Sequence, residues 1–542
     1  MVAPGAVPDG PNQRDPWRVW RGTEDCRRRT RRGSIRAGPS SCGTSREAPS
    51  SPSGATFPAK RLLGPRHWRV PVAQRTEQRT SNPPVECSNH SGDARPLSIP
   101  SPATDSRYDP CVTGTPTEPR SRLGREVLAL ARRALPPDAP IELTLASDAV
   151  AHRTTATRVV VAGPDAVARL LWPASPDALA EAYLRRDIDI EGDIWAAVDA
   201  GRSFDPRRLG RDIARLARLG LRLRQGMSPA PPPRRVARLS GRRHSRARDL
   251  AAVRFHYDVG NVFFALWLDR RLTYSCAYFE TPDTSLDEAQ DAKLELICRK
   301  LALTPGRRLL DIGAGWGSLV IFAAERHGVD AVGVTLSQPQ ATHANERAAE
   351  LGLGERVRVD VRDYRDLAPL GTFDAVASVG MFEHVGRANL PAYFRAARDA
   401  LRPGGLFLNH GIATTATRRA LRPLLLRFGS DGFVGRYVFP DGELVTVEDA
   451  IGFARKAGFE LLDAQSLRPH YALTLRAWVE RLEERAEEAR ALVDEEVYRT
   501  WRLYMAAARR AFEDGSLDVV QLLLARPAAH RPAPFPLRPW WT

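Results

Sequence analysis

Hydrophobic positions in the second half of the chain form short runs that alternate with amphipathic stretches. The run at 309–312 predicts the end of a buried strand, and residues 319–327 carry apolar side chains at helical spacing. Further apolar runs predict strands at 330–337, 373–379 and 401–409. This alternation predicts an α/β fold with a doubly wound, mostly parallel sheet that binds a ligand at the carboxyl ends of its strands.

A glycine-rich turn separates the first predicted strand from its helix. In LLDIGAGWGS, residues 309–318, three glycines permit a tight turn and a close approach of the backbone to a ligand at the helix N-terminus. By itself, this run fits a nucleotide cofactor and a plain structural turn about equally well. The second strand lacks the acidic end of a dinucleotide dehydrogenase, since residues 335–337 are Thr, Leu and Ser. The order of elements therefore favours a class I, Rossmann-like methyltransferase that uses S-adenosylmethionine.

Composition divides the chain into parts. Residues 1–120 are rich in Arg, Pro, Ser and Gly, so we expect them to be disordered or to be an extension read from a misassigned start codon. The predicted parts after them are a small N-terminal α+β domain at 121–205, a basic helix and linker at 206–248, the methyltransferase catalytic domain at 249–530 and a C-terminal tail at 531–542. The acidic run 187–193 is more typical of a strand edge than of a cation site, and no metal is predicted.

The net charge of +16 is concentrated in one segment. Between Arg207 and Arg248, fourteen arginines accompany a single acidic residue, Asp212. The first half of this segment predicts a basic interfacial helix. Its apolar face is expected to carry Leu209, Ile213, Leu216 and Leu223. Three interpretations stay open for the charge: anionic phospholipid headgroups, nucleic acid, or a merely solvated linker.

Six ordered motifs carry a resemblance to a known family. They are HYDVGN at 256–261, YSCAYF at 274–279, EAQDAKLELICRKL at 288–301, LDIGAGWGS at 310–318, GVTLSQPQ at 333–340 and MFEHVG at 381–386. Together they resemble cyclopropane-fatty-acyl-phospholipid synthases and mycolic acid cyclopropane synthases, over about residues 121–530. The aromatic residues of the first two motifs suit either a lid over a sulfonium cofactor or ordinary core packing.

The resemblance implies a role for individual residues. Contacts to S-adenosylmethionine fall on Tyr274, Ser275, Leu310, Asp311, Ile312, Gly313, Ala314, Gly315, Trp316, Gly317, Ser318, Thr335, Leu336, Ser337, Gln338, Pro339, Gln340, Tyr364 and Arg365. The catalytic set, which holds a bicarbonate ion in the family, falls on Cys276, Glu383, His410, Ile412 and Tyr471. Taken singly, Glu383 also suits a helix start beside His384, His410 a core histidine, Tyr471 an edge aromatic and Cys276 a small buried hydrophobic residue.

The chemistry of the implied reaction fits these residue types. An alkene is a weak nucleophile, so it attacks a sulfonium methyl group only in a dry, aligned pocket. Ring closure then needs a base, and bicarbonate oriented by hydrogen bonds would serve. The chain departs from the family at two positions, because Ala314 replaces a cysteine of the glycine loop and Ala508 aligns with a cysteine assigned as catalytic. The second departure favours a noncovalent route.

The implied function is transfer of a methyl(ene) group from S-adenosylmethionine to a cis double bond of a phospholipid acyl chain, which forms a cyclopropane fatty acid. The chain lacks a secretory signal and a run of about 18 apolar residues, so we expect a cytoplasmic enzyme, peripheral at the inner face of the membrane. Expected partners are an unsaturated phospholipid and an anionic membrane surface, with a homodimer left open and no specific nucleic acid. The alternatives are methyl or methylene branching, a small-molecule or RNA methyltransferase, and a basic nucleic-acid-binding protein with a degenerate methyltransferase fold.

Overall fold

The structure is a computed structural model, and it describes residues 118–148, 157–171, 175–231, 234–415, 432–528, 532 and 535–541. The expected extension therefore lies outside the described residues, apart from its last three positions. Within the described ranges, no helix combines the length and the apolar character that a bilayer crossing requires.

A small α+β domain occupies the first described part. Its elements are α1 (Glu118–Arg133), β1 (Ile141–Leu145), η2 (Ala146–Asp148), β2 (Thr157–Val161), α2 (Pro164–Leu171), α3 (Pro176–Leu184), β3 (Ile188–Glu191), α4 (Ile194–Ser203), η3 (Pro206–Leu209) and α5 (Asp212–Arg224). β2 lies between β1, which is parallel to it, and β3, which is antiparallel. The expectation of a smaller α+β domain is thus confirmed.

Helix α5 separates apolar residues that were expected to share one face. Leu219 and Leu223 are buried where α5 packs on α1 and α2, whereas Ile213 is 50% exposed. The tightest packing lies near Gly220, where an added Cβ would be 3.0 Å from Leu171 Cδ1. Ile213 lies two turns before this contact and outside it.

The catalytic domain is built on a seven-stranded sheet with the order β6-β5-β4-β7-β8-β10-β9. The strands are β4 (Arg308–Ile312), β5 (Asp330–Thr335), β6 (Val357–Val361), β7 (Phe373–Val379), β8 (Leu401–Thr414), β9 (Glu460–Ser466) and β10 (Leu517–Ala525). β4 to β8 pair in parallel, whereas β10 runs antiparallel to both of its neighbours. The chain order reverses beside β4, which is where a doubly wound sheet binds its ligand.

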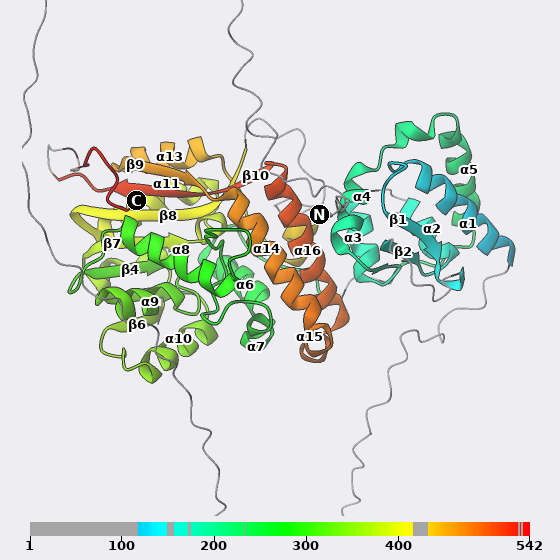
Figure 1. The fold of residues 1–542 in the computed structure, drawn as a ribbon. Coiled ribbons are helices and arrows are strands. Elements are labelled where there is room, and N and C mark those ends of the chain that lie inside the picture. The colour runs from blue at the N-terminus through cyan, green and yellow to red at the C-terminus, as the bar shows by residue number, and fades with distance from the viewer. Residues whose placement is uncertain are drawn as a thin grey trace, which may run out of the picture. The chain divides into compact units, whose positions relative to one another are not determined.

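Helices cover both faces of this sheet (Figure 1). The longer ones are α8 (Leu286–Lys300), α9 (Ser318–His327), α10 (Gln338–Glu350), α11 (Leu390–Ala400), α13 (Val447–Lys456), α14 (Arg468–Glu484), α15 (Ala486–Leu492) and α16 (Glu495–Glu513). Leu309 belongs to the apolar cluster with α8, α9 and α10, and Leu310 to the cluster with α11 and α13. Because neighbouring strand residues face opposite sides, β4 is buried on both, as the predicted class I methyltransferase fold requires.

Shorter elements complete the domain around the ends of the strands. They are α6 (Arg246–Tyr257), α7 (Asn261–Ala265), η4 (Tyr364–Asp366), η5 (Ala368–Leu370), η6 (Phe382–His384), η7 (Arg387–Asn389) and α12 (Phe433–Tyr437). Helix α16 also contacts the small domain through a buried arginine. Arg499 donates to the carbonyl oxygens of Tyr183 and Ile188 at 3.1 and 3.2 Å.

Candidate active site

The glycine loop after β4 forms one wall of a cavity. Gly313, Gly315 and Gly317 all have positive φ angles, of 89°, 55° and 81°. A Cβ added at Gly317 would lie 2.8 Å from Ala344 Cβ, and one added at Gly313 would lie 2.8 Å from Met381 Cβ. At Gly315 an added Cβ would meet no atom within 4 Å. Two glycines therefore serve packing, and the third faces open space.

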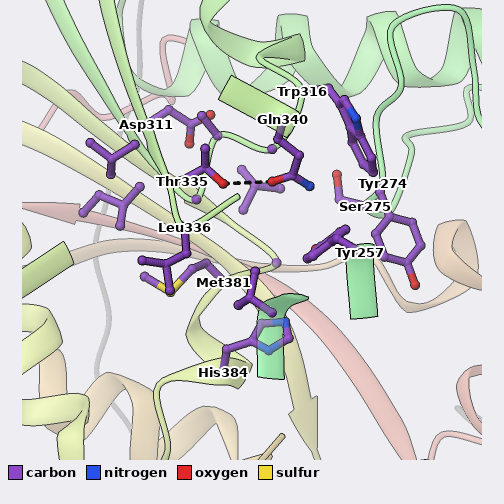
Figure 2. Close-up of a pocket in the computed structure, with 18 of the residues that line it drawn as sticks. Tyr257, Tyr274, Ser275, Asp311, Trp316, Thr335, Leu336, Gln340, Met381 and His384 are labelled. Carbon is purple, nitrogen blue, oxygen red and sulfur yellow. Dashed lines mark hydrogen bonds between the residues drawn. The ribbon is translucent and has the colours of Figure 1, made fainter. Parts of the chain in front are cut away.

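The cavity lies beside the carboxyl ends of β4 and β5. Figure 2 shows Asp311, Thr335 and Gln340 on one side of it and Tyr257, Tyr274 and Trp316 around it. The residues expected to contact the cofactor that line this cavity are Tyr274, Ser275, Asp311, Ile312, Gly313, Ala314, Gly315, Trp316, Ser318, Thr335, Leu336, Gln340 and Tyr364. These residues come from distant parts of the sequence, and the fold brings them together.

Six of the expected contacts lie away from the cavity lining, and each does something else. Leu310 is buried in the core. Gly317 packs on Ala344, and Ser337 caps α10 by accepting a hydrogen bond from the Gln340 backbone N–H at 3.4 Å. Gln338 and Pro339 are exposed in the first turn of α10. Arg365 forms ion pairs with Asp249 at 2.6 Å and Asp363 at 3.0 Å. A sequence motif is contiguous, but side chains alternate between the two faces of a strand and point in different directions around a helix. Only some residues of a motif can therefore face the cavity.

Two polar side chains of the cavity have an unpaired buried atom. The Thr335 hydroxyl donates to Gln340 Oε1 at 2.8 Å, and Gln340 Nε2 has no hydrogen-bond partner among the described residues. Asp311 Oδ1 is likewise buried without a partner in the described part of the chain. Burial raises the pKa of Asp311 to about 7. Such atoms are costly to bury unless a ligand satisfies them.

Lys293 also lines the cavity, although no role was predicted for it. Its ammonium group donates to Ser275 Oγ at 3.0 Å, and Gln290 Nε2 donates to the Ser275 carbonyl at 2.9 Å. Burial lowers the pKa of Lys293 to about 8. Residues three apart lie on one helix face, so α8 holds the segment that carries Tyr274 and Ser275. The sequence signal was a polar pair within the motif at 288–301.

The five residues of the expected catalytic set line a second, smaller cavity. Glu383 comes from η6, His410 and Ile412 from β8, Tyr471 from α14 and Cys276 from the segment before α8. The second cavity shares with the first Tyr257, Tyr274, Ser275, Gly380 and His384. The two cavities therefore adjoin. His384 lines both cavities and lies at their boundary.

Burial shifts the pKa values of the polar groups in the second cavity. Glu383 Oε1 accepts the Ile412 backbone N–H at 2.6 Å, and burial raises the pKa of Glu383 to about 7. Gln521 Nε2 lies 3.3 Å from His410 Nδ1, and burial lowers the pKa of His410 to about 3. Since an amide nitrogen can only donate, Nδ1 accepts and the neutral ring carries its proton on Nε2.

One acceptor and one donor consequently remain in this cavity. Glu383 Oε2 and His410 Nε2 are both buried, and neither has a partner within the residues the structure covers. Burial raises the pKa values of the Cys276 thiol and the Tyr471 phenol, which keeps both protonated. Cys276 is therefore a poor nucleophile. Ala508, which was expected to align with a cysteine, is buried in α16.

Aromatic rings surround the boundary between the two cavities. Tyr274 lies 5.2 Å from Trp478, and His256 stacks on Phe439 at 4.0 Å between ring centroids. The Trp316 indole N–H donates to Asn261 Oδ1 at 2.9 Å. Some rings line the cavities and others pack behind them in the core.

Comparison with known proteins identifies relatives of this chain. The family model described as mycolic acid cyclopropane synthetase matches residues 244–522. A probable fatty acid methyltransferase of Pseudomonas putida is 41% identical over 371 residues, which are 68% of this chain and 87% of that protein. Cyclopropane mycolic acid synthase MmaA2 of Mycobacterium tuberculosis is 40% identical over 281 residues, or 51% of this chain and 96% of that protein. The solved structure of mycolic acid cyclopropane synthase CmaA1 complexed with SAH and CTAB is 35% identical, covers 51% of this chain and 98% of its own, and has a TM-score of 0.48.

Proposed function

This chain belongs to the mycolic acid cyclopropane synthetase family, and on that premise we propose that it forms cyclopropane rings on unsaturated acyl chains of phospholipids. It is an S-adenosylmethionine-dependent methyltransferase that acts on lipids. The proposal of ring formation rests on the pair of adjoining cavities. One has the glycine loop expected to hold the cofactor, and the other has a buried acceptor, Glu383 Oε2, and a buried donor, His410 Nε2, without hydrogen-bond partners among the described residues.

The first cavity has the groups that S-adenosylmethionine needs. Gln340 Nε2 and Asp311 Oδ1 are unpaired polar atoms, and Gly315 leaves room for a ligand against the backbone. Tyr274 and Ser275, held by α8, would complete the grip. When bound, the cofactor supplies an electrophilic methyl group on a sulfonium centre.

The second cavity suits a small oxyanion that also has a hydroxyl group, and bicarbonate is such an ion. Glu383 Oε2 would accept a hydrogen bond from the hydroxyl group of the ion, and His410 Nε2–H would donate a hydrogen bond to one of its other oxygens. Ile412 also lines this cavity, and its N–H donates to Glu383 and so would orient that carboxyl group. A base held here would lie beside the cofactor cavity, where ring closure must release a proton.

The remaining residues of the site exclude water. Tyr257 and Tyr274 line both cavities, and His384 lies at their shared boundary. Aromatic faces also stabilise a developing positive charge on the acyl chain. We propose that the enzyme acts in the cytoplasm, at the inner face of the membrane, on phospholipids. This differs from the mycolic acids named for MmaA2.

The test is expression of the full chain in a bacterium without cyclopropane lipids, with a Glu383→Gln variant as control. Mass spectrometry and NMR of the phospholipid acyl esters should show a gain of one methylene unit with cyclopropyl proton signals, and the variant should lack both. Vinylidene or branched-methyl signals in place of the cyclopropyl signals would show that the enzyme forms a branch and not a ring. Unchanged lipids, although the purified protein binds S-adenosylmethionine, would refute action on phospholipids.

A further inference from the structure

The basic segment between Arg207 and Arg248 divides into two parts with different surroundings. In the second part, Arg246 pairs with Asp366, and Arg248 Nη2 donates to Asp441 Oδ1 at 2.9 Å. Arg235 is partly buried and donates to the Phe255 carbonyl at 2.7 Å. These arginines fasten the chain to the catalytic domain, so they are poorly available to another partner.

The first part, on α5, presents a stripe of arginines to solvent. Arg211, Arg218 and Arg222 are exposed, and they are spaced seven and four residues apart. At 3.6 residues per turn, this spacing places them along one line on the helix surface. No carboxylate of the described residues lies within 4.0 Å of any of the three, whereas Asp212 and the neighbouring Glu126 already pair with Arg133 and Arg215.

Apolar side chains lie on one side of this stripe, with Ala214 and Leu221 next to it and Ile213 farthest from it. Ile213 and Leu221 are each 50% exposed, and Ala214 and Ala217 are also exposed. The opposite side of α5 is occupied by its packing on α1 and α2, through Leu219 and Leu223. The free face thus combines cationic heads with apolar surface, and it is a stable part of a folded domain.

We propose that the exposed face of α5 is a docking surface for a bilayer of anionic phospholipids. The arginine stripe meets the headgroup phosphates, and Leu221 and Ile213 reach the boundary of the acyl region. A membrane suits this face better than a nucleic acid, because exposed Leu and Ile side chains gain nothing from a phosphate backbone and the face has no aromatic ring for base stacking. The inference rests on the proposed function, since it names the surface that brings the enzyme to a phospholipid.

Binding to vesicles tests the surface separately from the reaction. The full chain is sedimented with phosphatidylcholine vesicles that either contain or lack phosphatidylglycerol, and compared with the triple variant R211Q/R218Q/R222Q and with L221Q. The matched control is R326Q/R395Q/R455Q, which removes the same charge from three exposed arginines of α9, α11 and α13. Thermal unfolding verifies that every variant is folded.

We expect the wild type and the control to bind only the anionic vesicles, and the α5 triple variant to bind them on the order of 100-fold more weakly. L221Q should weaken binding to a smaller extent. All four proteins should modify an unsaturated phospholipid in nonionic detergent micelles equally well. Equal vesicle binding by the two triple variants would overturn the assignment to α5. If the protein binds short RNA or DNA more tightly than vesicles at physiological salt, and the α5 variant loses that binding, the partner of this surface is a nucleic acid and not a membrane. Vesicle binding without any turnover would refute the proposed function and leave the surface in place.

Discussion

Alanine substitutions at Gly315 and Gly317 should harm this protein in two different ways. Both residues have left-handed φ angles, of 55° and 81°, so an alanine at either position costs about 1–2 kcal/mol of folding free energy. At Gly317 the new Cβ would also lie 2.8 Å from Ala344 Cβ, which adds about 1–3 kcal/mol of overpacking. We therefore expect G317A to lose roughly 2–5 kcal/mol in all, and G315A only the first 1–2 kcal/mol.

The substitution at Gly315 should instead appear in cofactor binding. Gly315 lines the cavity and its added Cβ meets no atom within 4 Å, so we expect a steric cost only when the cofactor is bound. The same overpacking of about 1–3 kcal/mol corresponds to a roughly 5- to 150-fold weaker affinity for S-adenosylmethionine. Isothermal titration calorimetry measures this affinity, and denaturant unfolding measures the stability.

Gly306→Ala is the matched control for both substitutions. Gly306 has a φ of 78° and no atom within 4 Å of its added Cβ, but it lies in a turn away from the cavity lining. It should lose the same 1–2 kcal/mol as G315A and keep the cofactor affinity of the wild type. If G315A binds the cofactor as tightly as G306A, the loop is not the cradle. If G317A is no less stable than G306A, the contact with Ala344 is not tight.

Three further changes address other parts of the site. Lys293→Met removes the donor to Ser275. It should weaken the affinity for S-adenosylmethionine, measured by calorimetry, at least tenfold, as expected for a lost hydrogen bond to a charged group. Unchanged affinity would show that cofactor binding does not depend on the contact between α8 and Ser275. Glu383→Gln should slow turnover about 100-fold with unchanged cofactor affinity, since it replaces a bare acceptor by a donor. The pKa of Glu383 rises from 4.5 to about 7 on folding, so between these pH values the folded state binds more protons than the unfolded state. The contribution of Glu383 to the free energy of unfolding of the wild type should therefore decrease by up to roughly 3 kcal/mol as the pH is raised from about 5 to above 7. The variant should lack this Glu383 contribution, and identical pH–stability curves would contradict the buried carboxyl. Arg499→Met should lower stability by about 3–5 kcal/mol and leave cofactor affinity intact, because the Tyr183 and Ile188 carbonyls lose their buried donor; a loss of affinity would mean that the small domain shapes the cofactor site.

The parallel sheet and the glycine cradle were predictable because their signals are local. Apolar runs bounded by glycine mark β4 and β5 wherever the rest of the chain lies. Which residues of a motif face the cavity was not predictable. Gln338 and Gln340 belong to one motif, yet only Gln340 lines the cavity, because two positions on a helix point in different directions.

Features that depend on distant contacts were not readable from the sequence. The burial of Lys293 beside Ser275 comes from the packing of α8 on the site. The sequence of the basic segment did not show that Arg246 and Arg248 pair with Asp366 and Asp441, more than a hundred residues further along the chain. The mechanism of ion pairing is ordinary, but the partner of each arginine is set by the fold.

The position of β10 in the sheet has a consequence for the synthesis of this protein. This strand is the last of the catalytic sheet in chain order, yet it lies between β8 and β9 and supplies Gln521, the partner of His410. A nascent chain that has not yet released residues 517–525 from the ribosome leaves an apolar sheet edge unpaired and the histidine without its orienting amide. The sheet can therefore form completely only after β10 has left the ribosome, and until then the exposed edge favours aggregation or binding by chaperones. A product truncated before β10 would lack both the complete sheet and the partner of His410.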